Sequence, residues 1–128
     1  MDAKVFRITV EVGEGAGSFY GKLFGAEGRK VGGGRTYFDC GAVILALLEK
    51  KDPTALPEHV YFAVNDLEAV HARAEELGGL SKDQVHGASA REIMKRPWGE
   101  RSFYVEDPWK NKLCFVDERT LFTGKDPR

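Results

Sequence analysis

The side chain with the widest chemical use in this sequence is His59, which opens the segment HVYFAV at 59–64. Purely apolar positions alternate there with a mixed set that holds His59 and Tyr61, as in a strand with one buried face. A neutral imidazole on the mixed face can act as a general base or hold a polar group of a ligand. The alternative is a hydrogen-bonded histidine at a strand end with a structural role only, and the sequence leaves both interpretations open.

Arg7 lies on an earlier alternating segment, VFRITVEV at 5–12, on the same face as Thr9 and Glu11. A guanidinium stays protonated in proteins and offers only hydrogen-bond donors, so on the inner face of a strand it needs an acidic partner. One candidate partner is Glu11, on the same face of the segment. The other is a carboxylate or another anionic group of a bound molecule, which the guanidinium fork suits.

Four aromatic side chains fall in or beside the strand-like segments of the C-terminal half: Tyr61, Trp98, Tyr104 and Trp109. If they surround a common cleft, their large contact area and polar edges favour a flat, partly apolar ligand. Packing in the core or in loops is the alternative for each of them. The glycine-rich stretch VGGGRTYF lacks the GK[ST] ending of a phosphate loop and predicts a hairpin instead.

The elements that carry these residues follow the same order twice. The first module, about 5–50, begins with the alternating strand at 5–12 and continues into a short helix that ends at Gly25. Three further strands are predicted near 27–31, 35–39 and 42–49.

The second module, about 58–118, begins with the strand at 59–64. The next segment predicts a helix that starts with a capping box at Asn65 and Glu68 and that carries His71 on its solvated face. Three further strands are predicted near 90–96, 100–106 and 112–117, the last two joined by a tight turn at Asp107 and Pro108. The fold class is therefore α+β: two βαβββ modules in a single domain over 1–128, with a curved mixed sheet around a cleft.

Composition narrows the choice of partners. The chain has 128 residues with 19 Lys+Arg and 20 Asp+Glu, a formal net charge of -1, so no strong field favours a nucleic acid or an anionic membrane. The longest apolar run, AVILALL at 42–48, is too short to span a bilayer, and the first residues do not resemble a signal peptide. Cys40 and Cys114 stand singly without CxxC spacing. These features predict a cytoplasmic protein with free thiols and no membrane or nucleic-acid partner.

With these segments in view, the chain resembles the vicinal oxygen chelate superfamily, which includes glyoxalase I, bleomycin-resistance proteins, fosfomycin-resistance enzymes and extradiol dioxygenases. The resemblance is carried by FRITVEV with FYGKLFG, by HVYFAVNDLEAVHARAEELGG and above all by RPWGERSFYVEDPWKNKLCFVDE. It implies the glyoxalase/bleomycin resistance fold over nearly the whole chain.

The metal ligands of that superfamily are largely missing here. Members that do metal chemistry place a His on the first strand and a Glu on the last strand of each half. These four positions fall at Arg7, about Ala46, His59 and Cys114 of this sequence. Arginine cannot ligate a cation and alanine offers no donor, whereas a catalytic zinc or iron site needs about three protein ligands. The resemblance therefore predicts a protein with no metal cofactor.

Two classes of function follow from the resemblance. The first is a metal-independent small-molecule binding protein similar to the bleomycin-resistance branch, acting as a homodimer. Its predicted ligand contacts are Arg7, His59, Tyr61, Trp98, Tyr104, Trp109 and Cys114. The second is a lyase, isomerase or dioxygenase. It would use His59 as the catalytic base or a divalent metal at a displaced site built on Glu11, Glu49 or Glu118.

Overall fold

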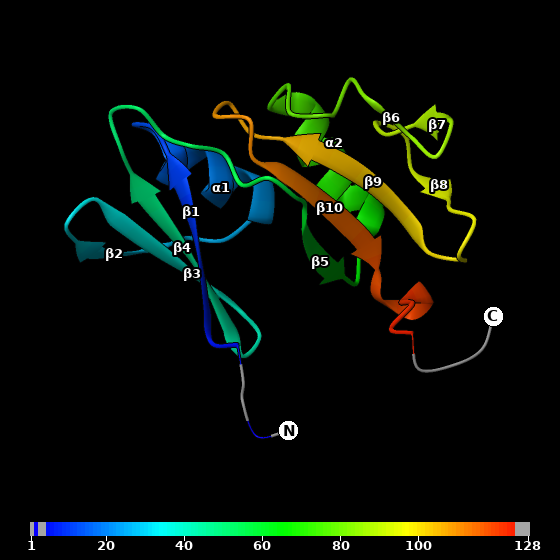
Figure 1. Ribbon diagram of the computed structural model, residues 1–128, viewed down its shortest axis with the longest axis horizontal. Coiled ribbons are helices and arrows are strands. Elements are labelled where there is room, and N and C mark those ends of the chain that lie inside the picture. Colours follow the sequence, from blue (N-terminus) through cyan, green and yellow to red (C-terminus); the bar gives the residue numbers. More distant parts are fainter. Residues whose placement is uncertain (1, 3–4, 125–128) are drawn as a thin grey trace. The chain divides into compact units, whose positions relative to one another are not determined.

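The computed structural model describes residues 2 and 5–124. The chain forms two compact units, Met1–Pro57 and Glu58–Arg128, and each contains a helix and a four-stranded sheet (Figure 1). In each sheet the first strand pairs in parallel with the last, and the other pairings are antiparallel. Across the described part of the chain, no helix combines the length and the apolar character that a membrane crossing requires.

The N-terminal unit follows the order of elements that the sequence predicts. Its elements are β1 (Arg7–Val12), α1 (Ala16–Phe24), β2 (Arg29–Gly32), β3 (Arg35–Cys40) and β4 (Val43–Glu49), with the sheet order β1-β4-β3-β2. Helix α1 packs on one face of this sheet, where Phe24 lies edge-on to Phe38 with ring centroids 5.3 Å apart. Gly25 ends α1 in the left-handed conformation at φ 66°, which glycine adopts without steric cost.

The C-terminal unit repeats this plan with additional short strands. Its elements are β5 (Val60–Val64), α2 (Leu67–Glu76), β6 (Gln84–Val85), β7 (Ala88–Ser89), β8 (Met94–Lys95), β9 (Arg101–Glu106), β10 (Lys112–Asp117) and the 3₁₀ turn η1 (Glu118–Thr120). The main sheet has the order β5-β10-β9-β8, and β6 pairs only with β7. The sequence predicts both ends of β5, β9 and β10 to within one residue.

Stacked aromatic rings form the core of the C-terminal unit beneath α2. The ring of Phe115 lies between Phe62 and Phe103, at centroid distances of 5.2 and 5.6 Å. Burying a side chain of this size stabilises the fold by about 1.5–3 kcal/mol. Because side chains alternate along a strand, the neighbouring residues of β5, β9 and β10 point to the opposite face of the sheet.

Helix α2 differs from the prediction at its start and on its polar face. The side chain that caps it is Asp66, whose Oδ1 accepts from the backbone N of Ala69 at 3.1 Å, so the capping box expected at Asn65 is wrong by one residue. His71 is half-buried and not fully solvated, because its Nε2 lies 2.9 Å from the carbonyl oxygen of Arg91 and its ring contacts Phe103 edge-on. A segment distant in the sequence covers this side of the helix.

The single strand expected at 90–96 is also wrong in detail. Only Met94–Lys95 form β8, residues 90–93 form no strand, and the β6–β7 hairpin lies before them. Its two-residue turn has positive φ at His86 (49°) and Gly87 (75°), as the turn geometry of such hairpins requires. The sequence gives little signal for this hairpin, because histidine is an uncommon residue at the first position of such a turn.

Candidate functional site

Three side chains from adjacent strands form a row on the face of the C-terminal sheet opposite α2. Cys114 on β10 lies in register with Tyr61 on β5 and with Tyr104 on β9. The row runs from exposed to buried, since Tyr61 is 58% exposed whereas Tyr104 and Cys114 are 3% and 1% exposed. Ala90 and Val85 pack against the two buried members. Tyr61 is therefore the member of the row that is accessible from solvent.

The buried members of the row are held in their neutral forms. Burial raises the pKa of the Cys114 thiol to about 11, although hydrogen bonds from Tyr104 and Ser102 partly oppose this effect. Burial also raises the pKa of the Tyr104 hydroxyl well above its usual range, and the neighbouring Cys114 adds to the shift. At neutral pH this part of the site contains a protonated thiol and a protonated phenol, neither of which is a ready nucleophile.

Arg96 supports this row from within the unit and was not predicted from the sequence. It is only 3% exposed, and its guanidinium donates to Ser102 Oγ (3.0 Å) and to the carbonyl oxygens of Ser89 (3.1 Å), Glu92 (3.3 Å) and Ser102 (3.1 Å). It also lies 5.2 Å from the centroid of the Tyr104 ring. A buried cation satisfied by carbonyl oxygens fixes the segment between β7 and β9 against the sheet.

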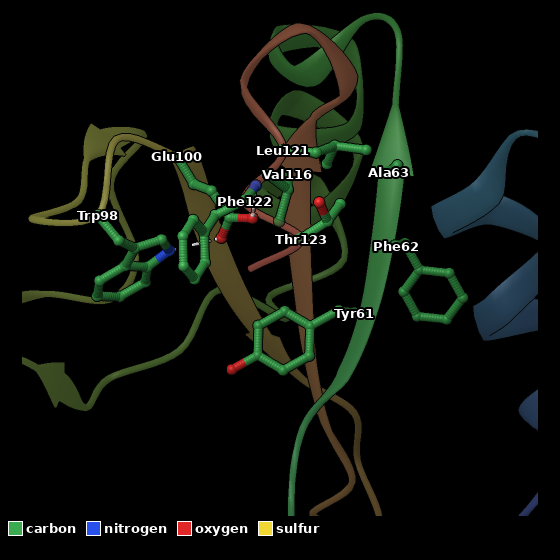
Figure 2. Close-up of a pocket in the computed structure, with 9 residues that line it drawn as sticks. All are labelled: Tyr61, Phe62, Ala63, Trp98, Glu100, Val116, Leu121, Phe122 and Thr123. Carbon is green, nitrogen blue, oxygen red and sulfur yellow. Dashed lines mark hydrogen bonds between the residues drawn. The ribbon is translucent and has the colours of Figure 1, made fainter. Parts of the chain in front are cut away.

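A pocket of about 480 Å³ lies next to this row (Figure 2). It is lined by Tyr61, Phe62, Ala63, Trp98, Glu100, Val116, Leu121, Phe122 and Thr123. Pockets of this volume hold small organic molecules. The pocket therefore combines the middle of β5, Val116 on β10, the turn before β9 and the segment after η1.

Glu100 organises one wall of the pocket. Its Oε1 accepts from the indole Nε1 of Trp98 at 2.6 Å, and its Oε2 accepts from the backbone N of Phe122 at 2.8 Å (Figure 2). The carboxylate thereby holds the indole ring and the segment after η1 in place. The sequence signal is the Trp-Gly-Glu spacing in the turn before β9, but the contact with Phe122 spans 22 positions and has no local signature.

His59 lies directly before β5, half-buried beside the row. Its ring is edge-on to Tyr104 at a centroid distance of 5.0 Å and lies 6.1 Å from the ring of Tyr61. Burial lowers the pKa of His59, and the charge of Lys112 lowers it further, while Glu58 and Asp83 act in the opposite direction. The neutral imidazole that a general base requires is therefore favoured at this position.

The other two predicted ligand contacts are Trp109, in a turn of the C-terminal unit, and Arg7, in the N-terminal unit. Trp109 sits in the β9–β10 turn, where its backbone N donates to Asp107 Oδ1 at 2.9 Å. Trp98 precedes β9 and Trp109 follows it, so the 6 residues of this strand, about 20 Å of backbone at about 3.4 Å per residue, lie between the two tryptophans in the chain. Arg7 begins β1 in the N-terminal unit, with its guanidinium carbon 5.0 Å from the centroid of the Phe6 ring.

The acid proposed as a partner for Arg7 has other contacts in the N-terminal unit. Glu11 forms an ion pair with Lys50 at 3.4 Å and accepts from the backbone N of Thr54 at 2.9 Å. The hydrogen bond from Thr54 is the main reason why the pKa of Glu11 is lowered. Glu11 thus ties β1 to the segment that follows β4.

The described residues do not fit the metal site of a chelating enzyme. Among residues 2 and 5–124, no group of three His, Cys, Asp or Glu side chains is placed to hold a metal ion. At the positions where the resemblance puts ligands in this unit, the structure has the imidazole of His59 and the thiol of Cys114, which are fewer than the three protein ligands that a catalytic zinc or iron site needs.

Comparison with known proteins agrees with this architecture. Residues 5–115 match the family model of the Glyoxalase/Bleomycin resistance protein/Dioxygenase superfamily. A search of curated proteins gives no match.

Solved structures show the same fold at low sequence identity. Oxidase ChaP-H2 is 23% identical with a TM-score of 0.71, covering 91% of this chain and 94% of its own. A glyoxalase/bleomycin resistance protein from Catenulispora acidiphila is 20% identical with a TM-score of 0.65, covering 90% and 98%. A bleomycin-binding protein complexed with bleomycin is 16% identical with a TM-score of 0.63, covering 91% and 98%. With the family model spanning most of its length, this chain belongs to the glyoxalase/bleomycin resistance protein/dioxygenase superfamily.

Proposed function

We propose that this protein binds a partly aromatic small molecule, without a metal ion, in the pocket of its C-terminal unit. The observation that carries the proposal is the gathering of Tyr61, Trp98 and Phe122 around one pocket. Aromatic rings supply large contact area at low entropic cost, and Tyr61 presents its ring to solvent. One protein of the same fold is described as bleomycin-binding, which supports a binding role for this architecture.

The predicted contacts take different roles in this proposal. Tyr61 and Trp98 contact the ligand, while Tyr104 and Cys114 lie beneath them and keep the surface in shape. His59 offers a neutral imidazole at the end of the row. Arg7 stays a prediction from the sequence, and Trp109, in the β9–β10 turn, is not among the residues that line this pocket. A homodimer stays part of the proposal, and sedimentation velocity on the purified protein tests it.

The test follows the indole N–H signal of Trp98 in ¹H–¹⁵N spectra, because this group donates to Glu100 at the pocket wall. The probes are 2-naphthol, 6-hydroxyquinoline and 8-anilinonaphthalene-1-sulfonate. We expect at least one of them to shift the signal saturably. Tyr61→Ala should weaken its binding about tenfold, equivalent to about 1.4 kcal/mol.

Trp109→Phe is the matched control for Tyr61→Ala. It removes the second indole signal, which assigns that of Trp98, and it changes an aromatic residue at the far end of β9. The proposal is contradicted if none of the probes shifts the Trp98 signal, or if Trp109→Phe weakens binding as much as Tyr61→Ala. Elemental analysis of protein purified without chelator tests metal independence, and a stoichiometric divalent ion lost in His59→Ala would overturn it.

A second candidate function is catalysis by His59 as a general base, as in a metal-free lyase or isomerase. The observation in its favour is the lowered pKa of His59, which keeps the imidazole neutral beside the exposed Tyr61. Incubating each bound probe with the protein and following it by ¹H NMR separates the two functions. A binding protein leaves the probe unchanged, whereas a catalyst converts it and loses this activity in His59→Gln.

A further inference from the structure

The carboxylate of Glu100 lies at the pocket wall, and no positively charged side chain among residues 5–124 forms an ion pair with it. It is 9% exposed, and both of its hydrogen-bond donors, the indole N–H of Trp98 and the backbone N–H of Phe122, are uncharged. Among the residues that the structure describes, no lysine, arginine or histidine forms an ion pair with it. The guanidinium of Arg96 is directed to oxygens of Ser89, Glu92 and Ser102 instead.

A buried negative charge of this kind favours a cation in its surroundings. Charges that leave water are normally paired, because hydrogen bonds from neutral donors replace only part of the lost hydration. Glu100 is among the side chains that line the pocket, so the space next to it is the space that a ligand occupies. A positive group there would complete the pairing.

The rings around Glu100 select the kind of cation. Trp98, Phe122 and Tyr61 line the same pocket as the carboxylate, and Figure 2 shows the three rings together with Glu100. The faces of aromatic rings carry negative charge density and attract cations within about 6 Å of the ring centroid, most strongly those that are weakly hydrated. Three rings and one carboxylate are therefore suited to an alkylated ammonium group.

Other ligand chemistries fit these groups less well. An anionic group would meet the charge of Glu100 at short range, which costs binding energy in a partly desolvated site. A small inorganic cation would need several oxygen ligands, whereas both Glu100 oxygens already accept hydrogen bonds from the protein. A neutral aromatic compound would contact the rings but would leave the carboxylate unpaired.

We propose that this pocket selects organic cations, namely aromatic compounds that carry a tertiary or quaternary ammonium group, with the positive charge placed against Glu100 and the rings of Trp98, Phe122 and Tyr61. This inference rests on the proposed small-molecule binding function and adds the charge of the ligand to it.

The test compares two compounds of nearly the same shape, (4-hydroxyphenyl)trimethylammonium and its uncharged carbon isostere 4-tert-butylphenol. Both are titrated into the full-length protein at low salt, and the Trp98 indole N–H signal reports binding at the pocket. We expect the cation to bind at least about tenfold more tightly than the isostere, the size expected of a partly desolvated cation–π site next to a carboxylate. This comparison needs no variant, so it stands even if a substitution unfolds the protein.

Glu100→Gln assigns the selectivity to the carboxylate. It keeps the size of the side chain and one acceptor oxygen, and we expect the ratio of the two affinities to fall to about one. Glu106→Gln is the matched control, because it removes the same charge from the exposed end of β9, and it should keep the ratio of the unaltered protein.

The outcomes distinguish this inference from the function on which it rests. Equal affinities for the two compounds, or a ratio that persists in Glu100→Gln, overturn the selection of cations while the aromatic pocket stands. If neither compound nor any of the aromatic probes shifts the Trp98 signal, the binding function fails and this inference fails with it.

Discussion

The two units of this protein have separate sheets of the same topology, but the side chains at equivalent positions differ. In the N-terminal unit, Ala46 on β4 lies in register with Thr9 on β1 and with Tyr37 on β3. The corresponding row of the C-terminal unit consists of Cys114, Tyr61 and Tyr104. The strand pairing is equivalent in the two rows. The N-terminal row has the small side chain of Ala46 at its centre, whereas all three side chains of the C-terminal row can form hydrogen bonds.

The units differ again at the strand after the helix. In the N-terminal unit this place is taken by β2, whose residues Arg29–Gly32 are all exposed. In the C-terminal unit, the longer segment with β6, β7 and β8 covers Tyr104 and Cys114 and brings in the buried Arg96. The shared order of strands therefore specifies the sheet in both units. The segment between the helix and the last two strands decides whether the face of the sheet opposite the helix is covered.

The largest expected effect contrasts the two cores at equivalent positions. Phe115 follows Cys114 as Leu47 follows Ala46, and both are 1% exposed. We expect Phe115→Ala to lower the free energy of unfolding by about 3–5 kcal/mol, because it removes the central ring of a stack, and Leu47→Ala by about 2–5 kcal/mol. Urea unfolding measures both. A smaller loss for Phe115→Ala than for Leu47→Ala would contradict the view that the ring stack is the stronger core.

A smaller effect is expected from the segment that covers the C-terminal row. Arg96→Met keeps the length of the side chain but leaves the oxygens of Ser89, Glu92 and Ser102 without their donor, so we expect a loss of about 2–4 kcal/mol. Lys30→Met on the exposed strand β2 is the counterpart in the other unit and should change stability by less than about 0.5 kcal/mol. Equal losses for the two variants in thermal or urea unfolding would show that Arg96 does not hold the segment.

The smallest effect is a difference in pH dependence between two matching positions. His59 and Arg7 each lie two residues before their row, at Tyr61 and Thr9. Since burial lowers the pKa of His59 in the folded state, the unfolded chain takes up the proton first as the pH falls. The stability that the neutral imidazole contributes is present above the usual histidine pKa of about 6.5 and is lost as the pH falls through the lower folded value.

Unfolding midpoints at pH 7.5 and pH 5.0 measure this difference. His59→Asn removes the titrating group, so its midpoint should depend less on pH than that of the unaltered protein. Arg7→Gln should leave the dependence unchanged, because a guanidinium does not titrate in this range. A steeper dependence in His59→Asn would mean that protonation of His59 stabilises the fold, against the direction of its lowered pKa.

Local periodicity in the sequence determined the main strands and helices of both units, but not the β6–β7 hairpin. Strict alternation predicts β1 and β5, helical spacing predicts α1 and α2, and the family resemblance predicts how they combine. The mixed face with His59, Tyr61, Tyr104 and Cys114 also follows from alternation, because side chains on a strand switch sides at every residue. These features depend only on neighbours along the chain.

The tertiary structure alone decided which of these side chains are buried and which hydrogen-bond partners the charged groups have. Tyr104 and Cys114 are buried by a hairpin whose turn residue gives little signal, and Trp109 lies a full strand away from Trp98. Glu100 gains Phe122 as a partner from the segment after η1, and Arg96 gains carbonyl oxygens from β7 and β9. Burial and pairing depend on contacts between segments distant in the sequence, and these contacts give the site its aromatic wall and a carboxylate that has no ion-pair partner among the described residues.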